Sequence, residues 1–222
     1  HLQKAEVRQI AQQNGLITAD KKDSQGLCFV GKIALPTFLQ QQLAPKIGPV
    51  IEVPSDLDQF KAYQTLQPIA SNIELLSKPF HFELTDGKEV TTHQGAHYYT
   101  IGQRKGLHIG GRPEPSFVIG IDTIHNIVYS GQNEQHPGLN RWALKLDESS
   151  ISWVNKVQEF ELKQLLPCLV RIRYRQPLQK ATLLKNDTGC YILFEHKQKG
   201  IAPGQFAAWY NGEELLGSGV IA

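Results

Sequence analysis

The first part of the chain carries apolar residues at helical spacing. In residues 1–16 they fall roughly on one face, and Asn14-Gly15 follows as a helix stop. A second apolar stripe occupies residues 35–43, where Pro36 fits the first turn of a helix. The pattern therefore predicts helices over 1–16 and 35–43.

The middle of the chain is typical of strands joined by turns. Residues 48–53 predict a strand, and residues 117–122 and 126–130 predict a hairpin with His125-Asn126 at its turn. Between them, residues 54–85 show no clear period and end at the turn signal Asp86-Gly87. We interpret 54–85 as a surface insertion with a helix or strand of its own. The interpretation we favour is a solvent-exposed elaboration, and the alternative is a segment that contacts RNA or a partner.

Beyond His136-Pro137-Gly138, the best domain boundary in the sequence, short strand patterns alternate with turn signals. The expected strands are about 140–146, 150–154, 168–175, 180–185, 190–195, 206–210 and 215–221. Five to seven short strands in this stretch predict a small closed barrel or a sandwich. The fold class we predict is mainly β with some α (α+β).

Alternation is clearest in residues 168–175. The two-residue period puts Cys168, Val170, Ile172 and Tyr174 on one face of a strand, and Arg171, Arg173 and Arg175 on the other. Cys168 and Cys190 are then expected to fill the core. The arginine stripe fits either a solvated outer face or a contact with a polyanion, and the pattern alone does not separate the two.

Composition limits the class of protein. The chain has 222 residues with 41% hydrophobic residues and a net charge of +2, too small by itself to indicate nucleic acid. The sequence has no apolar run of membrane-span length, no signal-peptide pattern and no CxxC pair of the kind found in zinc sites. Its three distant cysteines favour a reducing compartment, so we expect a cytoplasmic location and no membrane contact. A chain without methionine that begins at His1 is expected to be a piece of a longer protein.

Two loops carry candidate chemistry. Cys28 stands where a loop containing Lys21-Lys22 becomes a short apolar strand, so it is either a buried core cysteine or an accessible thiol with a lowered pKa. Glycines flank Gln103-Arg104-Lys105, which indicates an exposed, flexible loop with two cations. Such a loop either cradles phosphate or is a solvated turn.

Several motifs occur together and in order along the chain. They are Lys21-Lys22-Asp23-Ser24-x-Gly26-x-Cys28-Phe29-x-Gly31, His93-Gln94-Gly95, Thr100-x-Gly102-Gln103-Arg104-Lys105-Gly106-Leu107, Arg173-Tyr174-Arg175-Gln176, Pro203-Gly204-Gln205 and Tyr210-Asn211-Gly212-Glu213. Together they resemble one family, the bacterial tRNA-specific 2-thiouridylases (MnmA). The resemblance covers nearly the whole chain apart from 54–85. It implies a tail of the catalytic domain over 1–31, a central domain over 32–138 and a translation-factor-like barrel over 139–222.

The resemblance also implies an activity. The family makes 2-thiouridine at the tRNA wobble position, using ATP and magnesium to adenylate the uridine and a cysteine persulfide to deliver sulfur. A sulfur-relay protein or cysteine desulfurase loads the persulfide, and a disulfide with a second cysteine can follow. Cys28 matches the persulfide cysteine, and Arg173, Tyr174 and Gln205 match positions that contact tRNA. Arg104 and Lys105 extend that RNA surface as our own prediction.

The departures from the family pattern matter equally. The SGGxDS-type ATP loop and the first cysteine are absent from this sequence. We therefore expect the chain alone to be an inactive, monomeric fragment that binds tRNA but no cofactor or metal. The alternative is a non-catalytic RNA-binding module in which Cys28 is inert, and Cys28 reactivity separates the two. A methyltransferase has no support, because no glycine-rich nucleotide loop follows a strand.

Overall fold

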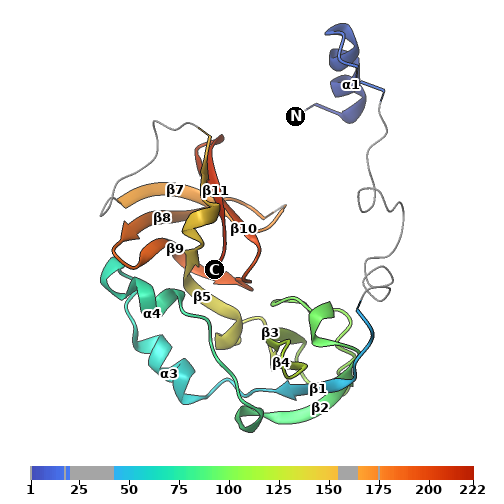
Figure 1. The fold of residues 1–222 in the computed structure, drawn as a ribbon, viewed down its shortest axis with the longest axis vertical. Coiled ribbons are helices and arrows are strands. Elements are labelled where there is room, and N and C mark those ends of the chain that lie inside the picture. The colour runs from blue at the N-terminus through green and yellow to red at the C-terminus, as the bar shows by residue number, and fades with distance from the viewer. Residues whose placement is uncertain (1, 18, 21–42, 155–164, 175) are drawn as a thin grey trace. The chain divides into compact units, whose positions relative to one another are not determined.

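The computed structural model describes residues 2–17, 19–20, 43–154, 165–174 and 176–222 (Figure 1). They divide into two compact units, His1–Pro45 and Lys46–Ala222. The predicted 35–43 helix, except Leu43, and the Cys28 loop lie outside the described residues.

The first unit contains the helix α1 (Lys4–Gln13). The Glu6 carboxylate accepts a hydrogen bond from the backbone N–H of Gln3 at 2.6 Å, which satisfies a donor that the first helical turn leaves open. After the helix, Gly15 adopts a φ of 67°, a left-handed conformation that glycine reaches without strain. The predicted helix and its stop are confirmed.

The second unit begins with a four-stranded sheet of order β2-β1-β4-β3. Its strands are β1 (Gly48–Glu52), β2 (Lys88–His93), β3 (Ser116–Asp122) and β4 (Ile127–Gln132). β1 runs parallel to β4, whereas the β1–β2 and β3–β4 pairs are antiparallel. The predicted strand and hairpin are therefore confirmed.

Both faces of this sheet are buried, as the alternation along β1 shows. Ile51 contributes to an apolar cluster on one face, together with Phe60 and Phe82. Val50 contributes to a second cluster, with Ala96 of the short 3-10 helix η3 (Ala96–Tyr98) and with Leu107. Residues outside the sheet therefore cover it on either side.

The segment 54–85 is one of these covering layers, so the expectation of a solvated insertion is wrong. It contains α3 (Asp58–Thr65), η1 (Ala70–Asn72), α4 (Ile73–Ser77) and η2 (Leu84–Asp86). Phe60 faces the four-stranded sheet, while Tyr63, Ile73 and Leu76 pack against Ala143, Leu184 and Tyr191 of the C-terminal sheet. Figure 1 shows α4 beside β5. Segment 54–85 thus covers apolar surface of both sheets and lies between them, and we call it the wedge.

Two polar side chains fix this wedge. The Tyr63 hydroxyl donates to the Leu76 carbonyl at 3.0 Å and accepts from the Trp142 backbone N–H at 2.8 Å. The buried guanidinium of Arg141 donates to the carbonyls of Ser77 at 2.7 Å and Ile201 at 3.1 Å. Burial lowers the pKa of Arg141 to about 10.

The rest of the second unit is a seven-stranded sheet of order β5-β9-β8-β7-β10-β11-β6. The strands are β5 (Asn140–Leu146), β6 (Ser152–Trp153), β7 (Leu165–Arg171), β8 (Gln179–Asn186), β9 (Gly189–Lys199), β10 (Phe206–Asn211) and β11 (Glu214–Val220). Its inner face holds one apolar cluster that includes Val170, Leu183, Ile192 and Trp209. A bridge between Leu146 and Ile221 joins the β5 end of the sheet to the residue after β11.

The observed fold is mostly strands with some helices, which confirms the predicted fold class. The chain passes from the four-stranded to the seven-stranded sheet at η4 (Pro137–Leu139), which overlaps the boundary His136-Pro137-Gly138 predicted from the sequence. Both sheets nevertheless belong to one compact unit, 46–222. The proposed division at residue 138 remains a prediction.

Candidate nucleic-acid interface

The end of β7 turns the arginine-rich segment toward the surface. The Gln176 side chain accepts a hydrogen bond from the Ile172 backbone N–H at 2.9 Å, and its own N–H₂ donates to Gln198 at 2.9 Å. The strand ends at Arg171 rather than continuing to residue 175. Ile172 stays buried at 2% exposure, whereas Tyr174 is 87% exposed. The expectation that Tyr174 shares the inner face of Cys168 is therefore wrong, because the strand ends first.

β10 supplies the opposite wall through its register with β7. Ala208 pairs with Arg171, and Trp209 pairs with Val170. Because Trp209 and Val170 fill the core, the alternation places Phe206, Ala208 and Tyr210 on the outer face. Gln205 precedes β10, and its backbone carbonyl accepts from the Ile221 N–H at 2.8 Å.

These two segments enclose a shallow cavity of about 460 Å³, which we call the β7–β10 recess. The β7 side contributes Arg171, Ile172, Arg173 and Tyr174. The β10 side contributes Gln205, Phe206, Ala208 and Tyr210. Arg173, Tyr174 and Gln205, which the sequence placed in two separate motifs, thus meet at one surface.

Arg173 also forms hydrogen bonds with two neighbouring segments at the rim of the recess. One terminal nitrogen of its guanidinium donates to the carbonyls of Ile101 at 2.9 Å and Gly200 at 2.8 Å. A Cβ at Gly102 or Gly200 would lie 2.9 or 2.5 Å from that nitrogen, so both glycines permit its close approach. Burial lowers the pKa of Arg173, and within the described residues no carboxylate forms an ion pair with it. Arg173 therefore joins the segment after β7 to the loop after Tyr99, and its charge has no ion-pair partner among the described residues.

Arg171 and Gln205 each have a buried polar atom without a partner. Within the part of the chain that the structure describes, Nε of Arg171 and Oε1 of Gln205 make no hydrogen bond. The Arg171 guanidinium lies over the Tyr210 ring, 6.0 Å from its centroid. The residues that line the recess thus combine positive charge, aromatic rings and two buried polar atoms without a hydrogen bond in the described residues.

The Arg104-Lys105 loop lies next to Arg173 at its start but faces a different hollow. The Gln103 side chain donates to the Lys105 carbonyl at 2.8 Å and accepts from the Thr100 N–H at 3.2 Å, so the loop is internally braced. Arg104 and Lys105 are exposed, as expected. Arg104 lines a hollow with His108 and Arg112 rather than the β7–β10 recess.

The described cysteines are core residues, as the alternation predicted. Cys168 and Cys190 are both buried in the apolar cluster of the seven-stranded sheet. Burial raises the pKa of each thiol to about 11, so both are protonated at neutral pH. Cys28 lies outside the described residues.

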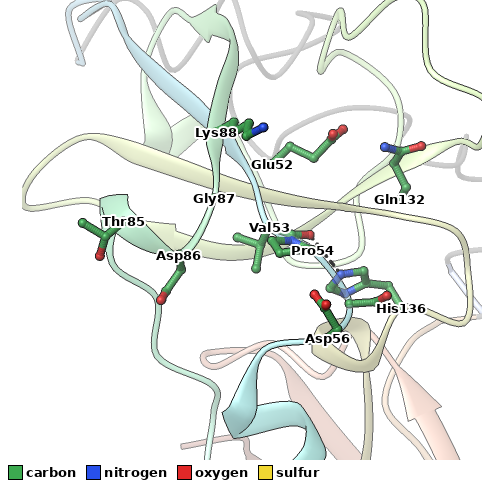
Figure 2. Close-up of a pocket in the computed structure, with 11 residues that line it drawn as sticks. Glu52, Val53, Pro54, Asp56, Thr85, Asp86, Gly87, Lys88, Gln132 and His136 are labelled. Carbon is green, nitrogen blue, oxygen red and sulfur yellow. Dashed lines mark hydrogen bonds between the residues drawn. The ribbon is translucent and has the colours of Figure 1, made fainter.

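A larger cavity, of about 840 Å³, lies beside the four-stranded sheet, and we call it the acidic pocket. Its charged lining residues are Glu52, Asp56, Asp86 and Lys88. Figure 2 shows the three carboxylates well separated rather than converging on one point. Among the described residues, no group of three or more His, Cys, Asp or Glu side chains is placed to hold a metal ion.

Local bonds occupy the other ionisable groups of the acidic pocket. His136 accepts from the Gly138 N–H at Nδ1, so its Nε2 carries the proton that it shares with the Val53 carbonyl at 3.1 Å (Figure 2). Burial lowers the pKa of His136. Glu52 forms an ion pair of 3.0 Å with Arg112. Of the predicted site residues that the structure describes, none lines this pocket.

Sequence reasoning missed Phe206, Ala208 and Tyr210 as parts of a site, and gave Gln176 no role. The signal for the first three was the alternation in residues 206–210, which by itself indicates only a strand and its two faces. No local signal in the sequence identifies Gln176 as the partner of the Ile172 N–H.

Comparisons with known proteins cover most of the chain. Three family models match in order: a tRNA methyl transferase HUP domain over residues 1–32, a tRNA methyl transferase PRC-barrel domain over 77–132, and an aminomethyltransferase beta-barrel domain over 144–221. Within the described residues, no helix is long and apolar enough to cross a membrane.

The similar curated proteins all carry one name, tRNA-specific 2-thiouridylase MnmA. The protein of Christiangramia forsetii is 50% identical over 222 residues, which are all of this chain and 56% of that protein. Those of Flavobacterium johnsoniae and Halalkalibacterium halodurans are 44% and 39% identical over the whole chain, which covers 56% and 50% of them. The chain thus spans about half the length of these relatives. The alignment with the first covers all of this chain and therefore includes 54–85. Together the ordered domain matches and the identity along the whole of this chain show that it belongs to the MnmA family of tRNA-specific 2-thiouridylases.

Proposed function

We propose that the chain is part of a tRNA-uridine 2-sulfurtransferase. In this proposal the 46–222 unit holds tRNA at the β7–β10 recess, and Cys28 carries the sulfur as a persulfide. The observation that supports the RNA half is the meeting of Arg173, Tyr174 and Gln205 at one surface, although they come from two motifs about 30 residues apart. The names of the relatives supply the reaction.

The chemistry of the recess suits RNA. Arginines neutralise phosphates, and exposed aromatic rings stack on bases, which single-stranded loops of RNA present. Arg171 and Arg173 bring two positive charges to one hollow, and Tyr174 and Phe206 are the exposed rings there. The acidic pocket has the opposite charge and would repel a phosphate backbone.

The sulfur half of the proposal depends on Cys28. The outer sulfur of a persulfide on Cys28 is the nucleophile. It forms the new bond to C2 of the adenylated uridine, and the C2–O bond breaks with AMP as the leaving group. A second thiol then attacks the Cys28 sulfur, the S–S bond breaks with its electrons on the transferred sulfur, and a disulfide remains. The buried and protonated Cys168 and Cys190 are unsuited to the role of this second thiol. A sulfur-relay protein or a cysteine desulfurase would load Cys28.

The ATP and magnesium of the family need residues that this sequence does not supply. The SGGxDS-type loop is absent, and the described carboxylates do not converge. We therefore assign no residue of this chain to either, although the HUP-domain match over residues 1–32 accords with ATP use by the longer relatives.

The RNA half is tested by equilibrium binding of an unmodified tRNA transcript to the whole chain between 50 and 200 mM salt. Arg173→Ala is expected to weaken binding roughly 10- to 100-fold, the range of a charge-assisted hydrogen bond, and to reduce the salt slope by about 1. Lys88→Ala removes the same charge from the acidic pocket and is the matched control. If Arg173→Ala and Lys88→Ala behave alike, the recess does not hold the tRNA.

The sulfur half is tested by mass-resolved alkylation of the three thiols at pH 7. The proposal expects fast labelling of Cys28 and slow labelling of Cys168 and Cys190, whose raised pKa keeps them protonated. Slow labelling of all three would favour the alternative, an RNA-binding module in which Cys28 is inert.

A further inference from the structure

The recess owes its depth to one small side chain. Ala208 lies between Phe206 and Tyr210 on the outer face of β10 and pairs across the sheet with Arg171. A larger residue at 208 would fill the space between the two rings. The resulting volume of about 460 Å³ falls in the range of small-molecule pockets, roughly 300–1,000 Å³.

Two polar side chains that line the recess narrow what could occupy it, namely Gln205 and Arg171. Oε1 of Gln205 and Nε of Arg171 are covered by protein atoms and make no hydrogen bond in the described residues. An amide and a guanidinium together carry donors and an acceptor, and the edge of a nucleobase presents groups that match both.

The rim of the recess supplies stacking surfaces. Phe206 is 62% exposed and Tyr174 is 87% exposed, and both line the recess. Arg171 over the Tyr210 ring adds a planar cation close to the floor. Planar aromatic and guanidinium groups are the surfaces on which unstacked bases settle in single-stranded RNA complexes.

We infer that the β7–β10 recess binds one unstacked nucleobase of the tRNA, stacked at Phe206 and Tyr174, with its edge toward the side chains of Gln205 and Arg171. This inference rests on the proposed tRNA binding and adds that the recess takes a base and not only phosphate. Arg173 acts as a positioning residue, since its bonds to Ile101 and Gly200 hold the rim in place.

The experiment compares two seven-nucleotide single-stranded RNAs of equal charge with the whole chain. One carries 2-aminopurine at its centre, and the other carries an abasic nucleotide there. The inference expects 5- to 100-fold weaker binding of the abasic RNA, the range that stacking of one base commonly contributes, and saturable quenching of the 2-aminopurine fluorescence.

Two variants locate the base. Ala208→Leu fills the recess without removing any group, and it is expected to abolish the difference between the two RNAs. Thr182→Leu, an apolar enlargement at an outward position of β8, is the control and should preserve that difference. Phe206→Ala should reduce both the quenching and the difference several-fold.

The outcomes separate this inference from the proposed function. Equal affinity for both RNAs, with salt-dependent binding intact, overturns the base recess but leaves tRNA binding standing. A difference that survives Ala208→Leu also overturns it, because the base then binds elsewhere. If neither of the two short RNAs binds and tRNA does not bind either, the proposed RNA function itself is overturned.

Discussion

The acidic pocket and the β7–β10 recess are both concave, yet they differ in charge. The acidic pocket is the larger, about 840 against 460 Å³, and three carboxylates line it. Two arginines line the smaller recess. Each hollow has at least one lining residue with a buried polar atom that makes no hydrogen bond in the described residues, Glu52 in the pocket and Arg171 and Gln205 in the recess. The comparison therefore teaches that the sign of the lining charge, rather than size, distinguishes the hollow that suits a polyanion.

Reversing a charge in the recess should give the largest effect. Arg171→Glu replaces a cation with an anion beside Arg173, and we expect tRNA affinity at low salt to fall at least 100-fold, since the variant loses an attraction and gains a repulsion. Lys88→Glu makes the same reversal in the acidic pocket and should change affinity less than 3-fold. Filter binding or fluorescence anisotropy measures both. Equal losses in the two variants would remove the distinction between the two hollows.

Arg173→Lys should separate charge from positioning. Lysine keeps the cation but does not place a donor where the terminal guanidinium nitrogen of Arg173 bonds both carbonyls, so the free energy of unfolding should fall by roughly 1–3 kcal/mol. The salt slope of tRNA binding should stay near that of the unaltered chain, because the charge is retained. Denaturant unfolding and the salt series together decide this, and a changed slope with unchanged stability would contradict the assignment.

Acidification should destabilise the fold through buried histidines, one of which, His136, lines the acidic pocket. Burial lowers the pKa of His136 below its ordinary 6.5, so its contribution to stability is full above that value and is lost as pH falls through the folded-state pKa. His93, whose pKa burial also lowers, acts in the same direction. We expect the unfolding free energy to fall below pH 6.5, with a shallower dependence in His136→Asn. An unchanged pH profile in that variant would mean that His136 is not the titrating group.

Neutralising the acidic pocket should give the smallest effect. Asp56 is exposed and lines that pocket, so Asp56→Asn should leave tRNA affinity within about 2-fold and stability within about 0.5 kcal/mol. Binding titrations and thermal unfolding measure the two quantities. A gain or loss above 5-fold in affinity would place RNA at the acidic pocket after all.

Much of the fold could be predicted because strand alternation is a local signal. Cys168, Val170 and Ile172 fill the core as their spacing indicates, and Asn126 adopts a φ of 61° at the predicted hairpin turn. The 54–85 segment was harder, because Phe60, Tyr63 and Leu76 face two different sheets from short helices. No single helical or strand period describes such a wedge.

The candidate site was predictable only in part. The Arg173-Tyr174 and Pro203-Gly204-Gln205 motifs pointed to RNA, but their meeting depends on the register of β7 with β10, which the sequence does not display. The exposure of Tyr174 depends on the hydrogen bond from the Ile172 N–H to the Gln176 side chain. A bond of this kind from a side chain to the backbone does not follow from the strand propensity of the segment. The Arg173 bonds to Ile101 and Gly200 join residues 72 and 27 positions apart, beyond the reach of local patterns.

The most direct measurement is ultraviolet crosslinking of bound tRNA to the whole chain, followed by mass spectrometry of the crosslinked peptides. The account predicts adducts on the peptides that contain Tyr174, Phe206 and Tyr210, and none on the peptides of residues 52–56 and 85–88. Adducts confined to the acidic pocket, with the recess peptides unmodified, would contradict it.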